Sequence, residues 1–278
     1  MDVEHLRSWI GRQEIVEDAL PVVPANALAA TFDYATFMQK GADLPPLWHW
    51  IYFLNLHRQS EIGEDGNGRK GGFIPPVPLP RRMFAGAQIF FDRPLKLGQR
   101  AWRESTIEDL TFKKGRTGEL AFLKIKVVIK DDDGVVLTEH QDLVYREPAT
   151  AVQPTGGAPS RRSSDWNETI EPSYALLFRY SALIFNAHRI HLDRPYAMDQ
   201  QGYGGLVVHG QLIATMLAEL ARKHMSAPMK SFRFKAIRPV LDVAPFSILG
   251  TQSGETVTLW AEDAAGEVAM EAEASFAA

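Results

Sequence analysis

Apolar and polar residues alternate along several segments of the chain. In the clearest of them, residues 123–130, leucine, isoleucine and valine occupy every second position and lysines three of the others. This period of two is typical of a strand with one buried and one solvated face. Related segments predict strands at 103–112, 136–145, 246–252 and 256–261, and a last strand that reaches Phe276. Turn residues at Asp133-Gly134 and Ala265-Gly266 separate neighbouring strands of antiparallel hairpins.

Two apolar runs have a length typical of helices rather than strands. Residues 44–56 (LPPLWHWIYFLNL) open with a proline pair, which a first helical turn tolerates because its N–H groups lack partners there. Residues 211–224 form the second run, which follows directly after Gly210. The pattern therefore predicts one helix in each half of the chain.

The order of these elements indicates an internal repeat. Each predicted helix is followed by an Arg-Pro pair, Arg93-Pro94 or Arg238-Pro239, and then by antiparallel strands with a turn glycine, Gly134 or Gly266. The fold class is therefore α+β, with two tandem units at 1–147 and 166–278. Residues 148–165, rich in proline, glycine, serine and threonine, are interpreted as the linker between them.

The two repeats differ in one insertion. From His57 to Arg93 the chain takes 22 residues more than from His224 to Arg238. The excess coincides with residues 58–80, which are rich in glycine and proline. Long loops of this kind are often functional. We interpret 58–80 as a flap over a ligand, and a mobile excursion without a role is the alternative.

Composition and charge exclude several classes of function. The chain has 30 basic and 34 acidic side chains, which argues against a nucleic-acid or membrane partner. It has no cysteine, so disulfides, thiolate metal sites and a cysteine nucleophile are excluded. No run of 18 apolar residues occurs, and residues 1–12 do not resemble a signal peptide. We expect a soluble protein of the reducing cytoplasm.

Candidate chemistry concentrates between residues 186 and 210. Three of the eight histidines, His188, His191 and His209, fall there together with Asn186 and Asp193. Histidine titrates near neutrality and suits proton transfer. Gly210 follows immediately and begins the predicted helix, whose free N–H groups can stabilise a developing negative charge. These parts suit chemistry on a carbonyl compound, and their spacing matches no known metal site.

These segments resemble a known family. The pattern Asn186-x-His188-Arg189-Ile190-His191-x-Asp193, followed by Gly202-Tyr203 and by Gly205-Leu206-Val207-Val208-His209-Gly210, is similar to the motif of MaoC-like hydratases (hydratase-2). It is more narrowly similar to type 2 thioester dehydratases such as mesaconyl-C4-CoA and itaconyl-CoA hydratases, which residues 44–50 and 80–86 also resemble. The resemblance implies a double hotdog fold, two units in which a long helix is wrapped by an antiparallel sheet. It also implies reversible hydration of a 2-enoyl-CoA, without a cofactor other than the substrate's coenzyme A.

The resemblance further implies roles for individual residues. His191 matches the catalytic histidine, and Gly210 matches the glycine whose N–H polarises the thioester carbonyl. Asn186 replaces the aspartate of the wider family; an amide cannot transfer a proton, so it is expected only to orient water or the imidazole. His188, Asp193 and His209 are candidates for supporting the imidazole, although His209 is equally consistent with a capping or core role. The stretch 33–40 of the first half has no matching histidine, so one active site, in the second half, is expected.

Recognition of the substrate is less constrained by the sequence. Arg189, Arg81, Arg82 and Tyr203 are candidates for binding a substrate carboxylate or the phosphates of coenzyme A. Solvated arginines are the alternative. A hotdog thioesterase and a non-catalytic acyl-CoA-binding module also remain open, as does the oligomeric state, with a homodimer among the alternatives.

Overall fold

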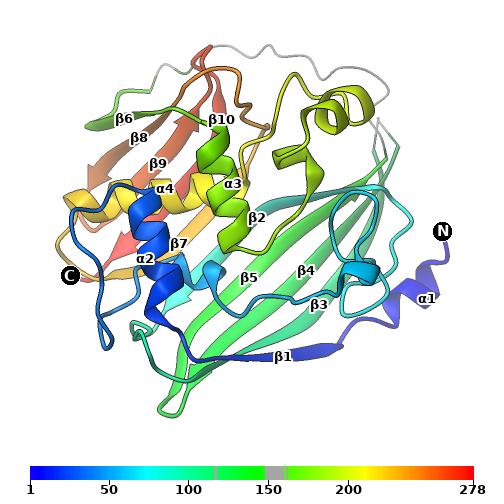
Figure 1. Cartoon of the computed structure of the whole chain (residues 1–278), viewed down its shortest axis with the longest axis horizontal. Helices are drawn as coiled ribbons and strands as arrows, with labels where there is room; N and C mark the ends of the chain where they lie inside the picture. Colours follow the sequence, from blue (N-terminus) through cyan, green and yellow to red (C-terminus); the bar gives the residue numbers. More distant parts are fainter. Residues whose placement is uncertain (116–117, 148–159, 161) are drawn as a thin grey trace.

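Ten antiparallel strands form one continuous sheet in the computed structural model, which describes residues 1–115, 118–147, 160 and 162–278 (Figure 1). The first half contributes β1 (Gln13–Asp18), β2 (Arg81–Phe91), β3 (Ala101–Gly115), β4 (Gly118–Asp131) and β5 (Gly134–Arg146). The second half contributes β6 (Trp166–Ile170), β7 (Met229–Ala236), β8 (Phe246–Ser253), β9 (Thr256–Glu262) and β10 (Val268–Phe276). The strands predicted from alternating residues are thus confirmed.

The order of the strands shows the predicted repeat. They follow one another as β1-β3-β4-β5-β2-β7-β10-β9-β8-β6, so the second half repeats the first in reverse order across the β2–β7 junction. The two Arg-Pro segments are equivalent: the N–H of Arg93 donates to the carbonyl of Val136, and that of Arg238 to Ala269. Each arginine side chain also pairs with a carboxylate after the corresponding strand, Asp131 or Glu267.

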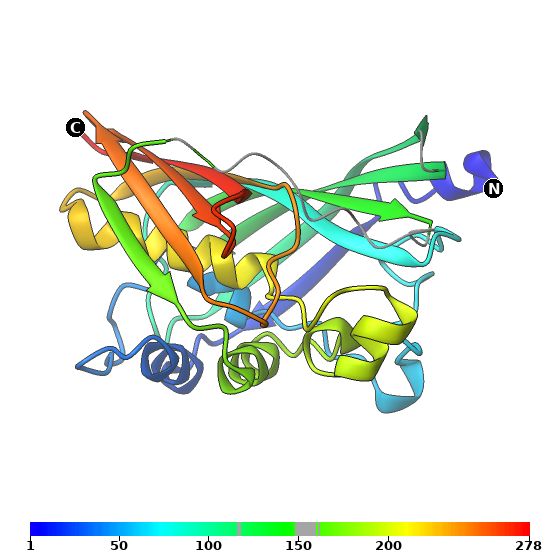
Figure 2. The same cartoon turned by 90° about the horizontal axis from the view of Figure 1, so that it is seen from above.

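The helices lie on one face of the sheet (Figure 2). The helix α4 (Gly210–His224) packs against β7, β8, β9 and β10, and α2 (Val22–Thr31) and α3 (Tyr174–Leu183) contact each other on its outer side. Every residue from Leu212 to Ala221 is buried because α4 is covered from both sides. The short α1 (Val3–Arg7) lies near β3, at one end of the molecule. Within the described residues, no helix has the length and hydropathy needed to cross a membrane.

The predicted helix at 44–56 is wrong. Only the 3-10 turn η1 (Trp48–Ile51) forms there, bounded by Leu47 and Phe53 with left-handed φ angles of 68° and 53°. Left-handed residues interrupt a right-handed helix. The side chains of η1 make tertiary bonds instead: the indole N–H of Trp48 donates to Glu219 of α4 at 2.9 Å, and that of Trp50 to Glu139 of β5 at 3.1 Å. Apolar content at the right length was insufficient to distinguish a helix from this buried irregular segment.

A cavity of about 800 Å³ lies beside the first-half sheet. It is lined by β3, β4 and β5 on one side and by the start of α4 and the histidine segment on the other, and residues of the 44–56 segment line it as well. Residues 58–80 run along its rim and include the 3-10 turn η2 (Gln59–Glu61). Most of the segment interpreted as the linker, residues 148–159 and 161, lies outside the described residues.

Candidate active site

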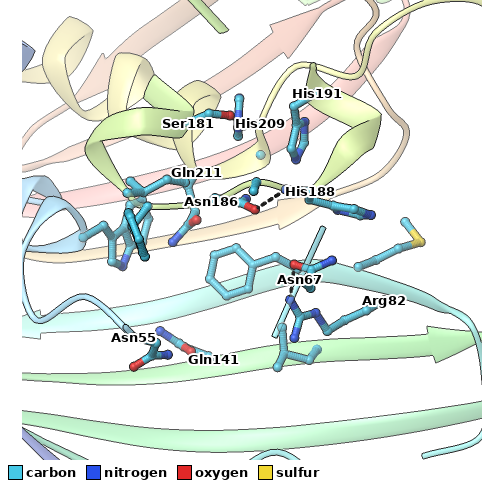
Figure 3. A pocket seen from close by; sticks show the side chains of 18 of the residues that line it. Asn55, Asn67, Arg82, Gln141, Ser181, Asn186, His188, His191, His209 and Gln211 are labelled. Atoms are coloured by element: carbon cyan, nitrogen blue, oxygen red, sulfur yellow. Dashed lines mark hydrogen bonds between the residues drawn. The ribbon is translucent and has the colours of Figure 1, made fainter. Parts of the chain in front are cut away.

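The cavity brings residues from both halves together (Figure 3). The histidine segment, which contains the 3-10 turn η3 (Arg189–His191), contributes Asn186, His188 and His191, and Gly210 lies at the start of α4. The π-helical turn η4 (Tyr196–Gln200) follows η3 and lies outside this cavity. The volume of the cavity, about 800 Å³, lies within the range of pockets that bind small molecules.

His191 is held as a neutral base. Its Nδ1 atom lies 2.6 Å from the carbonyl oxygen of Val207. Because a carbonyl can only accept, Nδ1 carries the proton and Nε2 is left with a lone pair. Burial, reinforced by the charge of His188, lowers the pKa of His191 to about 3, whereas the bond to Val207 opposes that shift. At neutral pH this imidazole can therefore accept a proton through Nε2.

The other two histidines surround His191. The ring of His209 stacks on it with a centroid separation of 3.7 Å, and the ring of His188 meets it edge-on at 5.5 Å. The Nε2 atom of His209 lies 2.7 Å from the hydroxyl of Ser181 on α3. Burial lowers the pKa of His188 to about 4 and that of His209 well below its ordinary value. The three rings are therefore neutral together near pH 7, and His209 is a buried packing partner that makes no capping bond.

Asn186 has a defined orientation in the cavity. Its Oδ1 atom accepts the backbone N–H of His188 at 2.9 Å (Figure 3). This bond leaves the Nδ2 hydrogens as the part of the amide that can reach a ligand. Asn186 can thus donate to a water oxygen while the Nε2 atom of His191 accepts a proton from the same water.

Gly210 is the first residue of α4, so its N–H has no partner within the helix. A Cβ at this position would lie 3.8 Å from Met270 Cε and 4.0 Å from the carbonyl oxygen of Phe84. Met270 and Phe84 both line the cavity, so the missing Cβ leaves the approach to this N–H open. The positive end of the helix dipole acts in the same place. An anionic oxygen would be stabilised there.

Asp193 does not support His191, contrary to our expectation. Its carboxylate instead accepts from the Arg189 guanidinium, at 2.7 and 2.9 Å, and from the N–H of Tyr196. The Val207 carbonyl takes the position next to the imidazole because the chain returns past His191 before α4 begins. Asp193 is therefore a structural partner of Arg189.

Arg189 points away from the cavity, toward the loop 58–80. Its backbone N–H donates to the backbone carbonyl of Asp65 at 2.9 Å, and its guanidinium donates to the backbone carbonyl of Glu64 at 3.1 Å. It also lies over the ring of Tyr196 at 4.2 Å. With these contacts made, Arg189 fastens the 58–80 loop to the histidine segment rather than facing the cavity.

The remaining candidates are divided between the cavity and its surroundings. The guanidinium of Arg81 donates to the Gln201 carbonyl and stands 5.6 Å from the ring centre of Tyr203, and Arg81 does not line the cavity. Tyr203 and Arg82 do line it. Arg82 also borders a neighbouring hollow of about 430 Å³ formed largely by the 58–80 loop.

Several groups at the site gave no signal in the sequence. The Val207 carbonyl is a backbone atom. Ser181 lies in α3, seven residues before His188, the first histidine of the motif. In the first half, the buried carboxylate of Glu139 accepts from Trp50 and Gln141 and pairs with His49 at 3.1 Å. These contacts depend on tertiary positions that sequence spacing does not encode.

Comparisons with known proteins agree with this geometry. Residues 47–242 match the family model for hydroxyacyl-thioester dehydratase type 2. The chain is 47% identical over 267 residues to the mesaconyl-C(4)-CoA hydratase of Chloroflexus aurantiacus, covering 95% of each. It is 28% identical to the mitochondrial hydroxyacyl-thioester dehydratase type 2 of Schizosaccharomyces pombe, covering 88% of this chain and 91% of the relative.

Solved structures support the fold. A MaoC-like dehydratase from Phytophthora capsici superposes with a TM-score of 0.67 at 15% identity, covering 100% of this chain and 99% of the other. HtdX of Mycobacterium tuberculosis gives a TM-score of 0.65 at 20% identity, covering 96% and 100%. The expected double hotdog is thus confirmed, with a long helix retained only in its second unit. By sequence and by fold, the chain belongs to the hydroxyacyl-thioester dehydratase type 2 family and is a hydro-lyase.

Proposed function

We propose that this enzyme reversibly hydrates a short, branched, dicarboxylic 2-enoyl-CoA, with mesaconyl-C4-CoA as the first candidate and itaconyl-CoA as the second. The similarity to the Chloroflexus hydratase over 95% of both chains supports this choice. The observation that carries the chemistry is the neutral His191, whose Nε2 is free in the cavity that also contains the Gly210 N–H. Coenzyme A as the carrier and a cytoplasmic location belong to the same proposal.

The reaction begins with a water held between His191 and Asn186. Asn186 donates to the water oxygen through Nδ2, and Nε2 of His191 accepts a proton as that oxygen attacks the β-carbon of the enoyl group. The double-bond electrons move toward the thioester, whose oxygen becomes an enolate. The N–H of Gly210 and the dipole of α4 stabilise that oxygen. The protonated His191 then returns its proton to the α-carbon, which gives the hydroxyacyl-CoA and restores the base.

A single base is sufficient in this scheme because the proton removed from water is the one delivered to carbon. Asn186 cannot exchange protons, and Asp193 is occupied by Arg189. The low pKa of His191 favours the second step, since the conjugate acid of a weakly basic imidazole is a strong proton donor. The 58–80 loop, fastened by Arg189, is proposed to cover the bound substrate.

The test is to incubate the protein with mesaconyl-C4-CoA and, separately, with crotonyl-CoA. Loss of the enoyl absorbance without release of free thiol is the result expected of a hydratase. Release of thiol would instead identify a thioesterase, in which water attacks the carbonyl carbon. Saturable binding without either change would identify a non-catalytic binding module.

A further inference from the structure

The two polar ends of the cavity differ in charge. Toward the first-half sheet, where Gln141 and Asn55 lie (Figure 3), Glu139 lines the cavity, is 1% exposed and accepts a hydrogen bond from Gln141 at 3.0 Å. Arg103 also lines this end, but it is paired with Glu14 at 3.1 Å. A second carboxylate placed here would be repelled by Glu139, and the positive charge of Arg103 is already offset. This end suits neutral polar groups rather than an anion.

The other end contains an arginine whose direct hydrogen-bond partner is neutral. Arg82 projects from β2 on the side of the cavity opposite His191 (Figure 3). Its guanidinium donates to the side-chain oxygen of Asn67, a neutral amide, at 2.5 Å. Among the side chains that the structure describes, no carboxylate pairs with Arg82 within 4.0 Å. Tyr145 lies close to the same guanidinium, and the N–H donors that these neighbours leave unused are available for another partner.

Asn67 holds Arg82 in this orientation from the 58–80 loop. Its backbone N–H donates to Asp65 at 3.0 Å, and its side-chain amide donates to the same carboxylate at 2.8 Å. These two bonds fix the amide so that its oxygen faces Arg82. The backbone carbonyl of Asp65 in turn accepts the N–H of Arg189. The guanidinium is thus fixed relative to the histidine segment before any substrate enters.

Arg82 lines the same cavity as the reactive groups. Burial is the main cause of the low pKa of His188; the negative charge of Asp65 opposes it, and the positive charge of Arg82 adds to it as the smallest of the three effects. The His188 ring in turn lies 5.5 Å from that of His191. In a mesaconyl-C4 thioester the free carboxylate is bonded directly to the β-carbon that water attacks, so it must lie within a few bond lengths of this centre. The planar guanidinium of arginine can bind both oxygens of a carboxylate, and a guanidinium held in one orientation also orients the carboxylate.

We propose that Arg82, positioned by Asn67, binds the free carboxylate of the acyl group and so selects dicarboxylic over monocarboxylic 2-enoyl-CoA substrates. This inference rests on the proposed function, because it concerns the substrate of the same site. The phosphates of coenzyme A carry the same kind of charge and are the competing source of an anion. Arg69 and Lys70 border the hollow next to Arg82, so further basic residues that suit phosphates lie beside it.

Two unreactive ligands separate these sources. Methylsuccinyl-CoA, with its thioester on the carboxyl remote from the methyl branch, retains the carboxylate, and isovaleryl-CoA has a methyl group in its place. Calorimetry gives Kd for both with the wild type, Arg82→Gln, Arg82→Lys and Asn67→Ala. The wild type is expected to prefer the dicarboxylic ligand. Arg82→Gln is expected to weaken its binding roughly tenfold to a hundredfold while leaving isovaleryl-CoA within about threefold.

The other variants refine the result. Arg82→Lys keeps the positive charge but not the paired N–H donors, so its affinity for the dicarboxylic ligand should fall less than that of Arg82→Gln. Asn67→Ala should also bind the dicarboxylic ligand more weakly, by a smaller factor than Arg82→Gln. Arg233→Gln, an exposed arginine that pairs with Glu273 outside the cavity, is the matched control and should leave the binding of both ligands unchanged. Equal weakening of both ligands by Arg82→Gln, or no preference in the wild type, would overturn the proposal. If selectivity behaves as expected but no enoyl-CoA is hydrated, the hydratase function fails and the carboxylate site stands.

Discussion

Gly210→Ala separates the catalytic role of the α4 start from its structural role. The added Cβ would lie 3.8 Å from Met270 and 4.0 Å from Phe84, which is ordinary van der Waals contact. The φ angle of Gly210 is not in the left-handed region, so alanine fits the backbone. Alanine is also the better helix former by roughly 0.5–1 kcal/mol. The variant should therefore fold with unchanged or slightly higher stability.

Activity should change in the opposite direction. The new methyl group projects into the cavity and blocks the close approach of a thioester oxygen to the N–H at position 210. Removing one oxyanion donor typically lowers turnover about a hundredfold to a thousandfold. We expect kcat/KM to fall at least about a hundredfold.

The assay is loss of enoyl absorbance from mesaconyl-C4-CoA, with thermal unfolding followed in parallel. Gly204→Ala is the matched control: it lies outside the cavity, its Cβ would meet only the flexible end of Leu241 at 3.3 Å, and its activity should stay within about threefold. If Gly210→Ala retains wild-type activity while folded, the helix start does not hold the developing oxyanion. If it unfolds, the packing described around Gly210 is wrong.

Further outcomes follow from the histidine segment. His191→Ala should lose about three orders of magnitude in kcat with little change in substrate Kd, and a loss below tenfold would remove it as the base. Asp193→Asn, in contrast, should lower kcat less than tenfold, because Val207 and not Asp193 orients the imidazole; a loss equal to that of His191→Ala would restore the original expectation. The profile of kcat/KM should show no inflection near pH 6.5, since burial lowers the pKa of His191 to about 3. The free energy of unfolding should fall as the pH drops below 6.5, because His191 and His209 stay neutral in the folded protein while the same residues bind protons in the unfolded chain. Urea unfolding at several pH values should show a slope of up to about 1.4 kcal/mol per pH unit for each of these two histidines. His209→Phe should reduce this slope.

The sequence alone predicted most strands of the fold and the order of its repeat. Alternation in segments such as 123–130 encodes which side chains are buried, and the turn residues Gly134 and Gly266 encode where the chain reverses. These are local signals with a fixed period, so they can be recognised without knowledge of the partner strands. The helix α4 was predicted for a related reason: its largely apolar run 211–224 contains no proline or glycine and is longer than a typical strand.

The chemistry of the site was predicted only in part. The histidine pattern drew attention to His191, Asn186 and Gly210, which the fold brings to one cavity. Their neighbours were assigned less well. Arg189 and Asp193 bind each other instead of a substrate or the imidazole, because a salt bridge four residues apart forms locally within their own turn.

What the sequence by itself determined is the set of locally encoded features: the strands, the long helix of the second half and the kinds of chemical group available between residues 186 and 210. The tertiary structure decided that residues 44–56 do not form a second long helix, because Trp48 and Trp50 bond to Glu219 and Glu139 far along the chain. The pairing of β2 with β7 joins the two repeats in one sheet, and the fold places Arg82 of one repeat and His191 of the other on the same cavity. Hydrogen bonds between residues remote in sequence carry no local period, so only the folded chain reveals them.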